Sequence, residues 1–116
     1  MTTRLPLTWH DGRIISADEP IASSLDHGLL LGDGVFDVLV VRDRRPMHVE
    51  RHLARLRRGL DRLDIVGAPD DATLISAIDA LVTAADLDEA RIRIAVSPGD
   101  GPSSRQRGPR PLTFVT

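Results

Sequence analysis

The stretch LDHGLLLGDGVFDVLVV, residues 25–41, decides the fold that we expect for this chain. Its first part carries three glycines within seven residues. Glycine permits positive φ angles and close backbone approach, so the plain structural interpretation is a tight connection before a strand. Within this loop, Leu25 to Leu31 suit one short helical turn. The run from Val35 to Val41 is mostly apolar and β-branched, which predicts a central strand buried on both faces.

The segments on either side of this stretch predict shorter strands and turns. An Asp-Gly pair at Asp11 and Gly12, between apolar residues, predicts a hairpin over residues 7–15. After the central strand, residues 43–46 (Asp-Arg-Arg-Pro) predict a turn. Met47 to Val49 is then expected to return as a short strand.

Two amphipathic helices follow. Over residues 50–65, leucines recur at spacings of three and four, and Gly67 and Pro69 stop the helix. A second helix is expected over residues 71–85, begun by two acids that suit its positive N-terminal end. Its expected buried face consists of Leu74, Ile75, Ile78, Leu81, Val82 and Ala85.

The last segments complete an α+β fold. Ala90 to Val96 alternate as a strand, residues 97–110 form a loop of glycine, proline and arginine, and Leu112 to Val115 form a final strand. Strands that flank paired helices predict a largely antiparallel sheet with two helices packed on one face. The 116 residues fit one domain.

The composition narrows the classes of function. There is no cysteine, which excludes disulfides, thiolate metal sites and a cysteine nucleophile. Residues 1–7 hold no long apolar run, and no stretch has the length of a membrane span, so we expect a cytoplasmic protein with no membrane partner. The net charge of −2 argues against a nucleic-acid partner. All 15 basic residues are arginine, and the chain contains no lysine.

Several arginines and histidines are candidates for a site, each with a plainer alternative. His48 and His52 have the spacing of metal ligands, but no third ligand is near, and we expect no metal. Arg55 lies off the apolar stripe; it is either a solvated helix residue or a bidentate clamp for an anion such as phosphate. Arg91 and Arg93 share one strand face, and each needs an internal carboxylate or a bound substrate carboxylate as its partner.

The ordered motifs resemble those of a known enzyme family. Residues 25–37, then the segment from Glu50 to Leu56 some fifteen residues later, and the opening Trp9-His10-Asp11-Gly12 are similar to the N-terminal domain of class IV aminotransferases. That family includes branched-chain and D-amino-acid aminotransferases, (R)-selective amine transaminases and aminodeoxychorismate lyases. The resemblance covers essentially the whole chain.

The resemblance implies a pyridoxal 5'-phosphate enzyme with two domains and the cofactor between them. It implies that Arg55 binds the phosphate group of the cofactor, and that sites are completed across a homodimer, with the segment near Leu31 contributing to the neighbouring pocket. Arg93 and Arg107 match regions that recognise the substrate in some members. Asp37 stands where the family commonly has glutamate, on the substrate side.

Some features depart from the family pattern. Leu31 replaces a common aromatic residue, and Ser97-Pro98-Gly99 replaces an Arg-Gly pair that several members carry. The Schiff-base lysine lies in the second domain of family members, which is absent from this chain, so no catalytic residue is expected here. The implied parent is an aminotransferase or a 4-amino-4-deoxychorismate lyase that takes an amino donor and a keto acid, or an amino-chorismate. The alternative is a non-catalytic domain that dimerises or docks.

Overall fold

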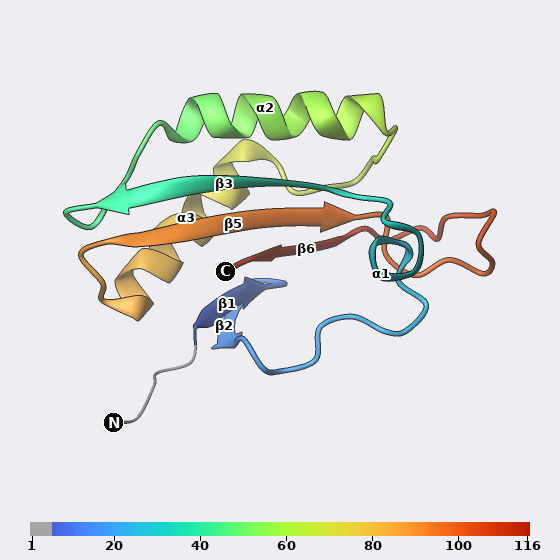
Figure 1. The fold of residues 1–116 in the computed structure, drawn as a ribbon, viewed down its shortest axis with the longest axis horizontal. Helices are drawn as coiled ribbons and strands as arrows, with labels where there is room; N and C mark the ends of the chain where they lie inside the picture. The colour runs from blue at the N-terminus through green and yellow to red at the C-terminus, as the bar shows by residue number, and fades with distance from the viewer. Residues whose placement is uncertain (1–5) are drawn as a thin grey trace.

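One six-stranded antiparallel sheet forms the body of the chain in this computed structural model, which describes residues 6–116 (Figure 1). The strand order is β2-β1-β6-β5-β3-β4. The strands are β1 (Leu7–His10), β2 (Arg13–Ser16), β3 (Val35–Arg42), β4 (Arg45–Pro46), β5 (Ala90–Ser97) and β6 (Leu112–Val115). The helices are α1 (His27–Leu31), α2 (Val49–Arg62) and α3 (Asp71–Ala85). The predicted α+β class with two long helices on one face is therefore confirmed.

The core lies between one face of the sheet and the two long helices. Alternate residues of β3 and β5, such as Leu39 and Ile94, point into it and meet leucines of α2 and α3. The expectation that β3 is buried on both faces is wrong, because both long helices cover the same face. Phe36 and Val40, on the other face, keep 65% and 39% of their surface exposed. We call this surface the helix-free face.

Two tight hairpin turns set the ends of the strands. Asp11 and Gly12 both have positive φ, 50° and 81°, as the predicted β1–β2 hairpin requires. Asp43 and Arg44 do the same between β3 and β4, with φ of 49° and 63°. The return strand is consequently β4, and the expectation of a strand over Met47 to Val49 is wrong, since Val49 begins α2.

The helices follow the predicted periodicity with small corrections. α2 ends at Arg62 rather than at residue 65. α3 has the predicted bounds, and the carboxylate of Asp70 accepts a hydrogen bond from the backbone N–H of Thr73 at its N-terminus. Ile75 is exposed, and Ala77 is buried in its place, because the buried stripe runs at intervals of three, one and three residues. None of the helices in residues 6–116 is long and apolar enough to cross a membrane.

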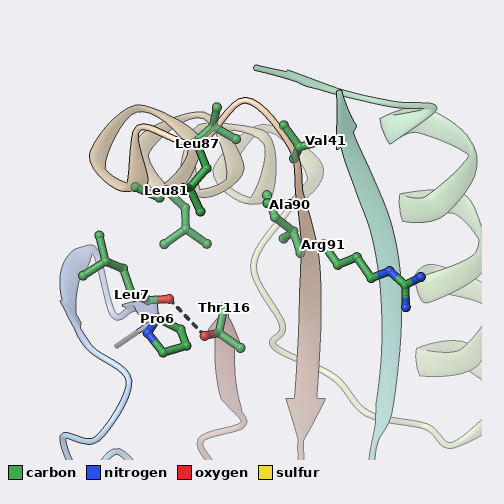
Figure 2. Close-up of a pocket in the computed structure, with 11 residues that line it drawn as sticks. Pro6, Leu7, Val41, Leu81, Leu87, Ala90, Arg91 and Thr116 are labelled. Atoms are coloured by element: carbon green, nitrogen blue, oxygen red, sulfur yellow. Dashed lines mark hydrogen bonds between the residues drawn. The ribbon is translucent and has the colours of Figure 1, made fainter. Parts of the chain in front are cut away.

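The largely apolar hollow at one end of the sheet offers little polar chemistry (Figure 2). It measures about 290 Å³ and lies between the end of α3, the start of β5 and the N-terminal segment. The hydroxyl of Thr116 at its edge donates to the carbonyl of Leu7 at 2.9 Å. The guanidinium of Arg91 points away from the cavity. The hollow therefore lacks a charged group aimed at a ligand.

Candidate functional site

A buried carboxylate on β3 and two side chains of α2 form the most developed polar cluster. Arg55 donates from Nε to Oδ2 of Asp37 at 2.6 Å and from Nη2 to Oδ1 at 2.9 Å. Nδ1 of His52 lies 2.7 Å from Oδ1 of the same carboxylate. The Asp37 side chain is only 2% exposed, whereas that of Arg55 is 62% exposed. The pair thus joins a buried anchor to a cation that faces outward.

The ion pair between Asp37 and Arg55 favours the charged form of both side chains. Hydrogen bonds from Arg55 lower the pKa of Asp37; burial opposes them, and the contact with His52 adds to the lowering. The same pairing raises the pKa of Arg55. Because the Asp37 carboxylate only accepts hydrogen bonds, His52 must donate from Nδ1. Its Nε2 atom then remains available as a second contact point.

The outward edge of Arg55 remains able to bind an anion. A guanidinium has five N–H groups, and Asp37 uses the one on Nε and one on Nη2. No other acceptor in residues 6–116 contacts the remaining edge. Arg55 lines a groove of about 460 Å³ together with His48, Arg51, His52, Ala54 and Arg58. The lining of this groove includes three arginines and no carboxylate, and such a lining favours an anionic group such as phosphate.

The second candidate cation, Arg93, lies on the helix-free face. Its guanidinium carbon is 5.1 Å from the centre of the Phe36 ring, which lies diagonally across the β3–β5 pair, two register positions away. It forms no ion pair within the described part of the chain, so the internal carboxylate considered for it is not found there. Arg93 and Phe36 border a mostly apolar hollow of about 470 Å³ that Phe114 also lines. This hollow suits an apolar group that carries an anion.

The remaining candidates lie near the glycine-rich loop. Arg107 donates from Nε and Nη2 to the two carboxylate oxygens of Asp33, at 3.0 and 2.9 Å, and from Nη1 to the carbonyl of Asp64 at 3.0 Å. All three of its nitrogens are thus engaged inside the chain. Leu31 is exposed at the end of α1. The structure therefore brings Asp37 and Arg55 together, whereas within residues 6–116 the side chains of Arg93, Arg107 and Leu31 form no hydrogen bond or ion pair with that pair.

Sequence reasoning missed two members of these clusters. His52 entered only as a metal candidate, although a histidine three residues before Arg55 shares its side of a helix. Asp33 enters the sequence analysis only as part of the tight glycine-rich connection, and its partner is 74 residues away. No group of three or more histidine or acidic side chains within residues 6–116 has a metal-binding arrangement.

Comparison with known proteins identifies the family. Residues 34–116 match the family model for amino-transferase class IV. The chain is 32% identical over 108 residues to the bifunctional aminodeoxychorismate lyase / D-amino acid transaminase of Mycobacterium tuberculosis, covering 90% of this chain and 35% of that protein.

Solved structures agree in fold and in sequence. The 4-amino-4-deoxychorismate lyase of Pseudomonas aeruginosa is similar with a TM-score of 0.76 and 35% identity, over 95% of this chain and 38% of that one. A pyridoxal-phosphate-bound hypothetical aminotransferase of M. tuberculosis is similar with a TM-score of 0.81 and 29% identity, over the same shares. The chain spans little more than a third of these relatives. With motif, geometry and fold in agreement, the chain belongs to the class IV aminotransferase family.

Proposed function

We propose that this chain is the phosphate-binding part of a pyridoxal-phosphate-dependent aminotransferase or aminodeoxychorismate lyase. The observation that carries the proposal is Arg55, which a buried carboxylate holds while one guanidinium edge stays open. The family membership and the names of the relatives support the cofactor and the reaction class.

In this proposal, Arg55 binds the phosphate of the cofactor through its open edge. Asp37 acts as a positioning residue rather than a substrate contact, because both its oxygens are already bound and its side chain is buried. His52 fixes the second side of the same carboxylate. The cofactor, when bound, supplies an electron sink for bonds at the substrate amine carbon. The chain's own share is to bind and orient that cofactor.

Arg93 is proposed to recognise the substrate carboxylate. Within residues 6–116 it has no ion-pair partner; it lies over an aromatic ring beside an apolar hollow, and such a cation favours an anionic partner. Arg107 remains a predicted substrate-side residue, although its present contacts favour holding the loop. Leu31 remains a predicted contact to a neighbouring subunit.

The parent is proposed to be a cytoplasmic homodimer that acts on an amino donor and a keto acid, or on an amino-chorismate. Exposed apolar side chains of α1 support association between copies. The Schiff-base lysine must come from another domain, because this chain has none. We propose that such a lysine-bearing domain completes the site.

The test is a screen of the full-length protein with pyridoxal phosphate. Transfer of an amino group from several donors is measured in parallel with release of pyruvate from aminodeoxychorismate. Turnover in either assay that needs the cofactor supports the proposal. A full-length protein that binds the cofactor but turns over no substrate in either assay would favour the second candidate, a non-catalytic dimerisation or docking domain. The feature that favours this second candidate is the lack of lysine in the chain.

A further inference from the structure

Four arginines of α2 form one exposed stripe along the helix. Arg51, Arg55, Arg58 and Arg62 follow one another at intervals of four, three and four residues, and all four are exposed. On a helix of about 3.6 residues per turn, these intervals keep the four side chains within roughly 60° of one another. The buried leucines of α2 lie on the opposite side. We call these four residues the arginine stripe.

Most of the charge on the stripe is not neutralised by neighbouring side chains. Asp37 pairs with Arg55, and the other three members of the stripe form no ion pair within residues 6–116. By contrast, Arg57, which lies off the stripe, pairs with Asp71. The helix contains five arginines and two acids, although the chain as a whole has a net charge of −2. Positive charge is therefore concentrated on this helix.

The stripe extends past the groove in which Arg55 lies. Arg51 and Arg58 line that groove together with Arg55, whereas Arg62 is not part of its lining. The seven residues between Arg55 and Arg62 correspond to about 10 Å along the helix axis. The field of a charge in water reaches about 30 Å at an ionic strength of 0.01 M and about 10 Å at 0.1 M. Arg62 therefore acts on an anion near the groove without touching one that is bound in it.

We propose that the arginine stripe attracts a small phosphate monoester from solution and guides it into the groove, where Arg55 holds it. This inference rests on the proposed function, because the ligand is the phosphate group of the cofactor. A phosphate monoester carries a charge of about −1.5 to −2 near pH 7. A patch of positive charge raises the local concentration of such an anion and the rate at which it associates. Arg62 then acts on the rate of binding and not on the bound state.

The experiment measures the binding rates of pyridoxamine 5'-phosphate to the full-length apoprotein by stopped-flow fluorescence. Arg62→Gln removes one charge outside the groove, and Arg51→Gln/Arg62→Gln removes a second. Glutamine is used because it favours helix almost as well as arginine. Arg13→Glu is the matched control. It changes the net charge as much as the double variant does, at an exposed residue of β2, at the opposite edge of the sheet from β4. Pyridoxamine, which has no phosphate, is the control ligand.

The expected effect is on association and depends on salt. At an ionic strength of about 0.01 M, the association rate constant falls roughly twofold in Arg62→Gln and roughly three- to fivefold in the double variant. The dissociation rate constant of Arg62→Gln stays as in wild type. The differences in association disappear near 0.5 M, where screening is almost complete. Arg13→Glu associates with pyridoxamine 5'-phosphate nearly as fast as wild type, and association of pyridoxamine is not slowed in any variant.

Three outcomes would overturn the inference while the proposed function stands. The first is an association rate constant at low salt that is the same in wild type and both stripe variants. The second is faster dissociation from Arg62→Gln with unchanged association, which makes Arg62 a contact of the bound ligand. The third is slowing by Arg13→Glu as large as that in the double variant, which means that only net charge matters. If Arg55→Gln binds pyridoxamine 5'-phosphate as tightly as wild type, the proposed function itself fails, and the guiding role with it.

Discussion

Asp37 and Arg55 form a bidentate pair in which the carboxylate is buried and the guanidinium faces outward. This arrangement separates two tasks: one residue fixes geometry, and the other meets a ligand. An arginine on an exposed helix surface would otherwise sample many rotamers, and ordering it on binding would cost entropy. Asp37 removes that cost in advance.

Replacing Arg55 is expected to weaken binding of the cofactor's phosphate. In Arg55→Gln, affinity for pyridoxamine 5'-phosphate should fall roughly 10- to 100-fold, because charge-assisted hydrogen bonds are lost. Equilibrium dialysis with the full-length protein measures it. Glutamine is chosen because a lysine would keep the positive charge and add a primary amine near the cofactor. Arg58→Gln, in the same groove, is the control, and its affinity for pyridoxamine 5'-phosphate should fall much less. Equal losses would mean that only general positive charge matters.

Replacing Asp37 is expected to affect both stability and binding. Asp37→Asn should cost about 1–2 kcal/mol in the free energy of unfolding, since a buried hydrogen-bonded group loses part of its bonding while its partner stays exposed. Phosphate affinity should also fall several-fold, because Arg55 loses its anchor. Asp43→Asn is the matched control, an exposed acid in a turn. Full phosphate affinity in Asp37→Asn would end the assignment of a positioning role.

The same pair predicts a dependence of stability on pH. The folded pKa of Asp37 is lower than its unfolded value of about 3.9. The contribution of ionised Asp37 to the free energy of unfolding is therefore fully present above the unfolded pKa. It is lost as the pH falls through the lower folded pKa. Urea unfolding of wild type and Asp37→Asn at a series of pH values tests this. The difference in the free energy of unfolding between wild type and Asp37→Asn should shrink below about pH 4. A difference that stays constant with pH would contradict the link between Asp37 ionisation and stability.

Arg93 is expected to act on substrate affinity more than on turnover. Arg93→Gln in the full-length enzyme should raise KM for carboxylate substrates roughly tenfold with a smaller change in kcat, as for a contact made equally in ground and transition states. Arg91→Gln is the control, since Arg91 lies two residues earlier on the same strand face and borders a different hollow. An unchanged KM would leave Arg93 as a surface partner of Phe36.

Two neighbouring residues of α3 test the position of the core. Leu74 is fully buried, so Leu74→Ala should destabilise the chain by about 2–5 kcal/mol through a cavity. Ile75 is 39% exposed, and Ile75→Ala should cost less than about 1 kcal/mol. Thermal or urea unfolding distinguishes them. Similar losses at both positions would show that the helix is rotated.

Sequence periodicity predicts the helices and strands of this fold better than it predicts which faces are covered and which distant side chains meet. The bounds of α3 and β6 follow from local pattern alone. The exposure of Phe36 does not, because an apolar run looks the same whether one face or both are covered. Asp37 and Arg55 could be placed together only once the register of α2 on β3 was known. The Asp33–Arg107 pair spans 74 residues and leaves no local signal.

The position of β6 has a consequence for how the chain is made. β6 lies between β1 and β5, and Trp9 pairs with Val115, so β1 has to wait for a neighbouring strand that is synthesised much later. A two-stranded hairpin alone is marginal in water, and such distant pairings form slowly. On the ribosome, β1 and β2 are expected to remain unprotected while α2, α3, β3 and β5 assemble. The entry of residues 112–115 then closes the sheet in a single late step.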